Sequence, residues 1–186
     1  MGQWTDWKAP SVAASVDRGG NPEWLSPDNA KTDDNNYANS SVGKGGVSDW
    51  LRLTSFGFDG GGGLPEGATV EGIEVQYKRA ANAADVITDS VIYLRDSSGQ
   101  VGDNKASATK WATSKETKTY PTSGGESDTW NAGLEASDIR ASTFGIDLSA
   151  DNTDEDNIRA AQIYFCQIRI YYTAPAAGRS FGTIMG

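Results

Sequence analysis

The chain has 186 residues, of which 37% are hydrophobic and 22% charged, with a formal net charge of −9 and a pI of about 4.4. This length and composition fit one folded domain with a sizeable core and exclude a disordered chain. The negative charge disfavours nucleic acid and membrane surfaces as partners, since both are also negative. Because the chain has no histidine, histidine-ligated zinc and catalysis by Ser-His-Asp or Cys-His groups are excluded.

Residues 1–49 are dense in turn-forming and polar residues, and they predict a loop-rich N-terminal arm that packs on the rest of the domain. Trp4, Trp7, Trp24 and Tyr37 are spaced through this segment. Two interpretations of their rings stay open: they pin the arm to its own domain, or they dock on another subunit. No apolar run approaches the length of a bilayer span, so we expect no membrane-spanning segment. The first residues do not have the basic-then-apolar pattern of a leader, so we expect no export signal.

Residues 50–173 are expected to form a β-sandwich domain, because β-rich segments alternate there with turn signals. The first strand is predicted at 50–58, with a bulge near Thr54 or Ser55. Strict alternation at 69–79 turns Glu74, Gln76 and Lys78 toward water, and the strand at 89–95 is expected to pair with it. Further strands are predicted at 142–148 and 161–173, weaker edge strands at 100–120, and one helical turn at 134–140.

The segment 161–173 is the most regular strand of the chain, and we expect it to lie at the centre of its sheet. Its alternation puts Tyr164, Cys166, Ile168, Ile170 and Tyr172 on one dry face. Cys166, the single cysteine, is expected to be a small core residue there. The opposite face carries Phe165, Gln167, Arg169 and Tyr171. The predicted fold is therefore an all-β, antiparallel, jelly-roll-like sandwich with extended N- and C-terminal arms.

The acidic loop at 151–157 is the best metal candidate in the sequence, through Asp151, Asp154 and Asp156. Clustered carboxylates suit calcium, but the spacing lacks the glycine and the distal glutamate of an EF-hand loop. An acidic loop is also more often simply solvated. Calcium is therefore a weak expectation, and no other cofactor is predicted.

Nothing in the sequence singles out the pair of acids that glycoside hydrolysis needs, so we do not expect an enzyme. A carbohydrate-binding jelly-roll module is a stronger alternative, because exposed aromatic rings can stack on sugars. The candidate rings are Trp24, Trp111, Tyr120 and Trp130. The plain alternative is that these rings are buried.

Residues 174–186 change abruptly to proline, alanine and glycine and form a predicted C-terminal arm. Phe181, Ile184 and Met185 are too apolar to lie comfortably in water. We expect the arm to pack on its own domain or on a neighbouring subunit.

Several weak motifs together resemble β-sandwich structural proteins of tailed bacteriophages, over about residues 28–173. None of these motifs is catalytic. The resemblance implies a component of the virion head or tail without saying which. The motifs are NA at 29–30, YA at 37–38, WLRLTSFGF at 50–58, LPEGATVEGIEV at 64–75, KW at 110–111, DTW at 128–130, STFGI at 142–146 and IYYT at 170–173.

We therefore expect a non-enzymatic virion protein, first a capsid decoration or cement protein on the capsid surface, present in the host cytoplasm before assembly. Its expected partners are the major capsid protein, other virion proteins and further copies of itself, with surface glycans as another possibility. A tail, baseplate or fibre protein and a carbohydrate-binding jelly-roll module are the alternatives. The partner-binding candidates are Trp4, Trp7, Phe181, Ile184 and Met185.

Overall fold

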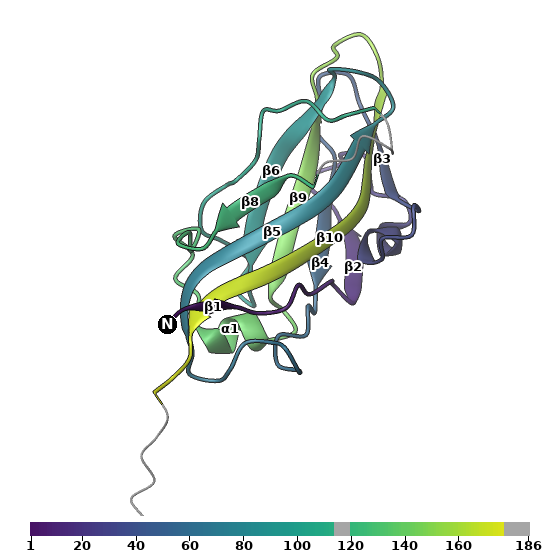
Figure 1. Ribbon diagram of the computed structural model, residues 1–186. Helices are drawn as coiled ribbons and strands as arrows, with labels where there is room; N and C mark the ends of the chain where they lie inside the picture. Colours follow the sequence, from purple (N-terminus) through teal and green to yellow (C-terminus); the bar gives the residue numbers. More distant parts are fainter. Residues whose placement is uncertain (114–119, 177–186) are drawn as a thin grey trace, which may run out of the picture.

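The computed structural model describes residues 1–113 and 120–176, which form two antiparallel β-sheets packed face to face (Figure 1). Sheet A has the strand order β1-β10-β5-β8, with β3 also paired to β10, and sheet B has the order β2-β4-β9-β6-β7. The predicted all-β sandwich is confirmed. The strands are β1 (Gln3–Trp4), β2 (Val12–Val16), β3 (Ala38–Val42), β4 (Trp50–Thr54), β5 (Thr69–Ala81), β6 (Ile87–Arg95), β7 (Gln100–Val101), β8 (Thr122–Gly125), β9 (Gly145–Asn152) and β10 (Arg159–Thr173), and the short helices are η1 (Pro27–Lys31) and α1 (Ala136–Arg140).

The last strand, β10, is the central strand of sheet A, as its regular alternation predicts. It pairs with β5 along one side and with β1 and β3 along the other. Its register shifts between Ile163 and Phe165, so Ile163 joins Cys166 in the core cluster. Tyr164 is buried but lies outside that cluster, with its ring 5.1 Å from the Tyr37 ring. The bulge thus corrects the predicted alternation at one position.

The expected pairing of 69–79 with 89–95 is wrong, because β5 lies in sheet A and β6 lies in sheet B. Both strands turn their apolar residues toward the same core. The alternating pattern looks the same whether two strands face each other across the sandwich or pair within one sheet, so it could not tell these arrangements apart. The first predicted strand also ends early. It stops at Thr54, and Ser55 follows with φ at 58°, a left-handed conformation that leaves the strand.

Residues 1–49 contribute β1 and β3 to sheet A and β2 to sheet B, so this segment is part of the sandwich and not only an arm lying on it. Its tryptophan at position 24 is buried in the core, with an exposed fraction of 1%. The C-terminal candidates Phe181, Ile184 and Met185 lie outside the described residues. In the described parts of the chain, no helix is long and apolar enough to cross a bilayer.

Candidate functional site

In sheet A, β10 lies between β1 and β5 (Figure 1), so outward-pointing residues of the three strands are neighbours on one face. Residues directly opposite each other on paired strands point to the same side of a sheet. Since Cys166, Ile168 and Ile170 fill the core, the residues between them on β10 point outward. We call this surface the aromatic face. It is formed by Trp4, Trp7, Glu74, Gln76, Gln167, Arg169 and Tyr171.

Arg169 organises the aromatic face. Its guanidinium carbon lies 4.1 Å from the centroid of the Trp4 ring and 4.5 Å from that of Trp7. Its Nε and Nη2 atoms donate to one carboxylate oxygen of Glu74, at 2.8 and 2.7 Å. Because the arginine is held by the ion pair and also contacts both rings, two partly exposed indoles are kept in one arrangement.

Tyr171 extends the row of rings toward the end of the strand. Its ring meets the Trp4 ring edge to face, with centroids 5.1 Å apart. The neighbouring Glu126 carboxylate, which stabilises the protonated hydroxyl, is the main reason that the pKa of Tyr171 is raised. A Cβ atom on Gly72, the residue opposite Tyr171, would lie 2.1 Å from the carbonyl oxygen of Gly125. Glycine at this position is therefore what lets the chain at 125–126 lie so close to the face.

Beside the rings lies a row of hydrogen-bonding side chains. Gln167 donates through Nε2 to Oε1 of Gln76 at 3.0 Å, and Gln76 donates to the hydroxyl of Thr122 at 3.3 Å. An amide carries both donors and acceptors, and these two keep unused capacity on partly exposed side chains. The face thus combines ring surfaces with groups that can bind hydroxyls.

A charged cluster lies at the other end of the same sheet face. Lys78 forms an ion pair with Asp33, and its Nζ lies 5.6 Å from the centroid of the Tyr120 ring. Tyr120 also donates its hydroxyl to Asp33. Arg169 and Lys78, the cations of this face among the described residues, are thus each paired with a carboxylate, and the whole chain carries a charge of −9.

The rings proposed for sugar stacking fall into two groups. Trp24, Trp111 and Trp130 are buried, with exposed fractions of 1%, 2% and 0%, so that expectation is wrong for them. Their indole N–H groups donate to Asp49 O, Asp89 Oδ1 and Ile73 O inside the protein. Because each polar N–H group has a buried partner, these tryptophans can lie in the core without an unsatisfied donor. Tyr120 is 38% exposed and borders the aromatic face.

Trp4 and Trp7 pack on their own sheet, around Arg169, which is the first of the two interpretations that the sequence left open. The sequence did not single out Arg169, Glu74 or Tyr171 as functional. The available signal was their outward position in two alternating strands. What was missing was the pairing of those strands, which places the residues side by side.

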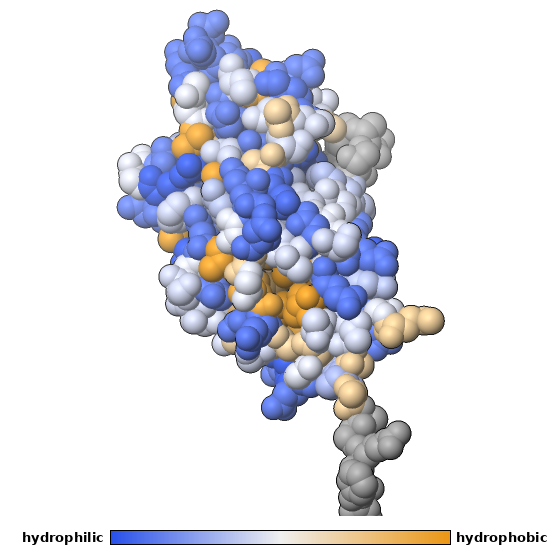
Figure 2. Space-filling model, turned by 90° about the vertical axis from the view of Figure 1, so that its left-hand side faces the viewer, coloured by the Kyte–Doolittle hydropathy of each residue, from blue (hydrophilic) through white to orange (hydrophobic). Residues whose placement is uncertain are grey.

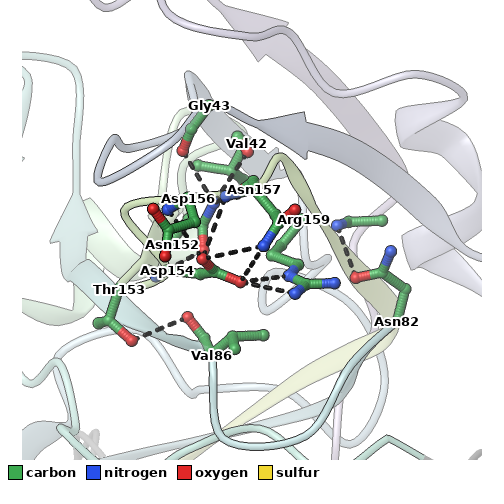
Figure 3. Close-up of polar contacts among 11 residues, drawn as sticks. Val42, Gly43, Asn82, Val86, Asn152, Thr153, Asp154, Asp156, Asn157 and Arg159 are labelled. Carbon is green, nitrogen blue, oxygen red and sulfur yellow. Dashed lines mark hydrogen bonds and ion pairs between the residues drawn. The ribbon is translucent and has the colours of Figure 1, made fainter.

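The acidic loop is held together by its own side chains (Figure 3). Asp154 accepts from Arg159 Nε at 2.7 Å and Nη2 at 2.6 Å, and from the backbone N–H groups of Asp156 and Asn157. The ion pair with Arg159 is the main reason that the pKa of Asp154 is lowered to about 2. The side-chain amide of Asn152 donates to the carbonyls of Val42, Gly43 and Asn157.

These contacts give Asp154 a structural role, since its oxygens bind groups of the protein. Within 1–113 and 120–176 there is no group of three or more His, Cys, Asp or Glu side chains that could hold a metal ion. Asp151 lies in β9, where it pairs with Thr88. Calcium binding at Asp151, Asp154 and Asp156, the weak expectation from the sequence, has not been tested. Because Arg159 already holds Asp154, we expect equal melting temperatures in millimolar calcium and in EDTA, and a clear rise with calcium would show that the loop binds the metal.

Comparisons with known proteins identify no family. No family model matches the chain, and no curated protein matches it. Among solved structures, the CBM22-1 xylan-binding domain of Xyn10C from Paenibacillus barcinonensis is similar, with 15% sequence identity and a TM-score of 0.39. The match covers 90% of this chain and 99% of that domain.

Proposed function

We propose that the aromatic face binds an extended, uncharged polysaccharide and that the protein is a non-catalytic, glycan-binding β-sandwich. The observation that carries this proposal is the pair of partly exposed indoles, Trp4 and Trp7, held around Arg169 on the outside of a sheet. Rings that are ordered before binding lose little conformational entropy when a ligand arrives. The proposal rests on this geometry, not on the overall likeness to the xylan-binding domain.

The chemistry of the face suits a sugar chain. The C–H faces of a pyranose ring are apolar and pack on indole and phenol rings, while its hydroxyl groups need both donors and acceptors. Gln167 and Gln76 provide amide groups directly beside the rings, while the nearly buried carboxylate of Glu74 holds Arg169 in place. An aromatic row next to a polar row therefore matches the two kinds of surface that each sugar unit presents.

Charge pairing selects for an uncharged ligand. Arg169 is already neutralised by Glu74, and Lys78 by Asp33, so an acidic sugar would find its cations occupied. The overall charge of −9 further disfavours anionic chains. From Phe165 to Tyr171 the strand spans about 20 Å at the usual rise per residue, which suits a chain of several sugar units.

Trp4→Ala should weaken binding to a responsive neutral polysaccharide about tenfold or more, because it removes one ring and loosens Arg169. A panel of neutral and acidic polysaccharides in affinity gel electrophoresis would find the ligand, and calorimetry would measure the loss. Trp7→Ala should have a similar effect.

Trp50→Ala is the matched control. Trp50 is also a partly exposed tryptophan beside an arginine, since Arg18 lies 5.9 Å from its ring centroid, but it belongs to β4 in sheet B. Its loss should leave binding unchanged. Equal binding by wild type, Trp4→Ala and Trp7→Ala, with all variants folded, would contradict the proposal, as would binding of acidic chains only.

The virion hypothesis stays a prediction, and it is compatible with a glycan-binding face. A particle that displays such a face would bind glycans on a cell surface. The packing of Trp4 and Trp7 on their own sheet gives no support to exchange of an N-terminal arm between subunits. Imaging of intact particles with a gold-labelled antibody against this chain would show whether it lies on a head, on a tail or on neither.

A further inference from the structure

An open pocket of about 930 Å³ lies where β5 begins and the short helix α1 packs beside it. Its apolar lining includes Ala68, Val70, Leu134 and Ala136. Figure 2 shows apolar side chains gathered in a hollow low on one side of the molecule, near the end from which the C-terminal chain leaves. Apolar residues that line an open hollow gain free energy when a complementary side chain covers them.

The end of β10 delivers the chain to the rim of this pocket. Thr173, the last residue of β10, pairs with Thr69, which lines the pocket. Two residues further on, Pro175 Cβ lies 3.9 Å from the position that a Cβ on Gly67 would take, and Gly67 is also a lining residue. The chain therefore leaves the sandwich beside the hollow.

The charges of the rim match the segment that follows. The charged lining residues are Asp59, Glu66, Glu135 and Arg140, so carboxylates outnumber the cation. Arg140 is itself within 3.6 Å of a Glu66 oxygen. The chain beyond Ala176 carries Arg179 as its charged residue, followed by three apolar ones, Phe181, Ile184 and Met185.

We propose that this pocket is the docking site of residues 179–185 of the same chain, with Phe181 on the apolar lining and Arg179 at the acidic rim. The five steps from Ala176 to Phe181 can span up to about 17 Å, which is enough to enter a pocket that begins beside Pro175. A tether this short gives the segment an effective concentration in the millimolar range. The segment of the same chain is therefore favoured over that of a neighbouring copy.

Paramagnetic labelling of the full-length chain tests the proposal. A spin label on Thr183→Cys should be selective, because Cys166 is fully buried and burial raises the pKa of its thiol. If the segment docks, the methyl resonances of Val70 and Leu134 lose most of their intensity. The methyl resonances of Ile158, just before the start of β10 at the opposite end of that strand, should keep theirs.

A mixed sample decides which chain provides the segment. Isotope-labelled protein without the spin label is combined with unlabelled protein that carries it. We expect no broadening in this mixture, because each segment occupies its own pocket. Broadening of Val70 and Leu134 in the mixture would overturn the proposal in favour of a neighbouring copy, and no broadening in either sample would overturn docking altogether.

Two variants connect the signal to the pocket. Leu134→Asp on the lining should abolish the broadening, whereas Ile158→Asp, a change of the same kind at an exposed site, should not. Arg179→Glu tests the contact with the acidic rim. Because position 179 lies beyond the described residues, this variant gives a result even if Leu134→Asp does not fold. It should reduce the broadening several-fold, and an unchanged signal in Arg179→Glu would refute the role of the rim.

Discussion

Replacing Asp89 with alanine should lower the free energy of unfolding by about 3–5 kcal/mol, because it leaves a buried guanidinium without its counter-charge. The side chains of Asp89 and Arg79 are 2% and 7% exposed and form an ion pair. Asp89 also accepts hydrogen bonds from the Tyr77 hydroxyl at 2.8 Å, the Trp111 indole at 3.0 Å and the Ser107 backbone N–H at 3.0 Å. Urea unfolding would measure the loss.

The effect is expected to be large because this network joins the two sheets. Arg79 and Tyr77 belong to β5 in sheet A, and Asp89 belongs to β6 in sheet B. The Arg79 guanidinium carbon also lies 5.2 and 5.3 Å from the ring centroids of Tyr77 and Trp111. Losing the carboxylate therefore disturbs one charge, several donors and the contact between sheets together.

Two controls separate the buried charge from a general effect of removing an aspartate. Asp103→Ala removes a carboxylate that is 49% exposed and 4.0 Å from Lys105, and it should change the unfolding free energy by less than about 0.5 kcal/mol. The double variant Arg79→Met with Asp89→Leu removes both charges, so it should cost less than Asp89→Ala alone. If the double variant were the least stable of the set, packing or the three donors that lose Asp89, and not the unpaired charge, would be the cause.

Gly124→Ala should cost about 3 kcal/mol or more, because the site excludes a side chain in two ways. Its φ of 81° is one that residues with a side chain rarely adopt. A Cβ there would lie 2.0 Å from the carbonyl oxygen of Ile73 and 2.4 Å from the indole nitrogen of Trp130. Those two atoms form the 3.0 Å hydrogen bond that holds Trp130 in the core, so the added methyl group would break it.

The neighbouring glycine provides a matched control. At Gly125, no atom of the described residues lies within 4 Å of an added Cβ, apart from the chain neighbours. Gly125→Ala should therefore change stability by less than about 1 kcal/mol. Thermal unfolding compares the two variants, and near-ultraviolet circular dichroism reports the Trp130 environment. Equal melting temperatures for the two would show that the backbone at 124 relaxes without loss.

Gly124 also connects stability to the proposed binding surface. It lies opposite Glu74 in the pairing of β8 with β5, and Glu74 holds Arg169. The backbone of β8 therefore sits against the strand that carries the polar row of the aromatic face. A variant that moves β8 should weaken glycan binding as well as stability, whereas Trp4→Ala should affect binding more than stability.

Local alternation determined much of the fold and half of the site. The period of two at 69–79 and 161–173 already places Glu74, Gln76, Arg169 and Tyr171 on the side of their strands opposite the core, and it identifies the last strand as the central one. Glu74 points to that side but is only 8% exposed, because Arg169 covers it. These positions follow from the geometry of a strand, in which successive side chains point to opposite faces. The acidic loop was also recognisable as a polar segment of its own.

Only the tertiary structure decided which strands are neighbours and which rings are buried. A strand with one dry face satisfies its pattern equally well beside β6 or beside β10, so alternation cannot choose the partner of β5. Likewise, tryptophan is long enough to fill a core or to cover a surface. The buried tryptophans, Trp24, Trp111 and Trp130, donate their N–H groups to acceptors inside the protein. Trp4 and Trp7 instead pack against Arg169 on the outer face of sheet A. These contacts join residues that are distant in the sequence, more than 150 positions apart for Trp4 and Trp7 with Arg169, and no local pattern encodes them.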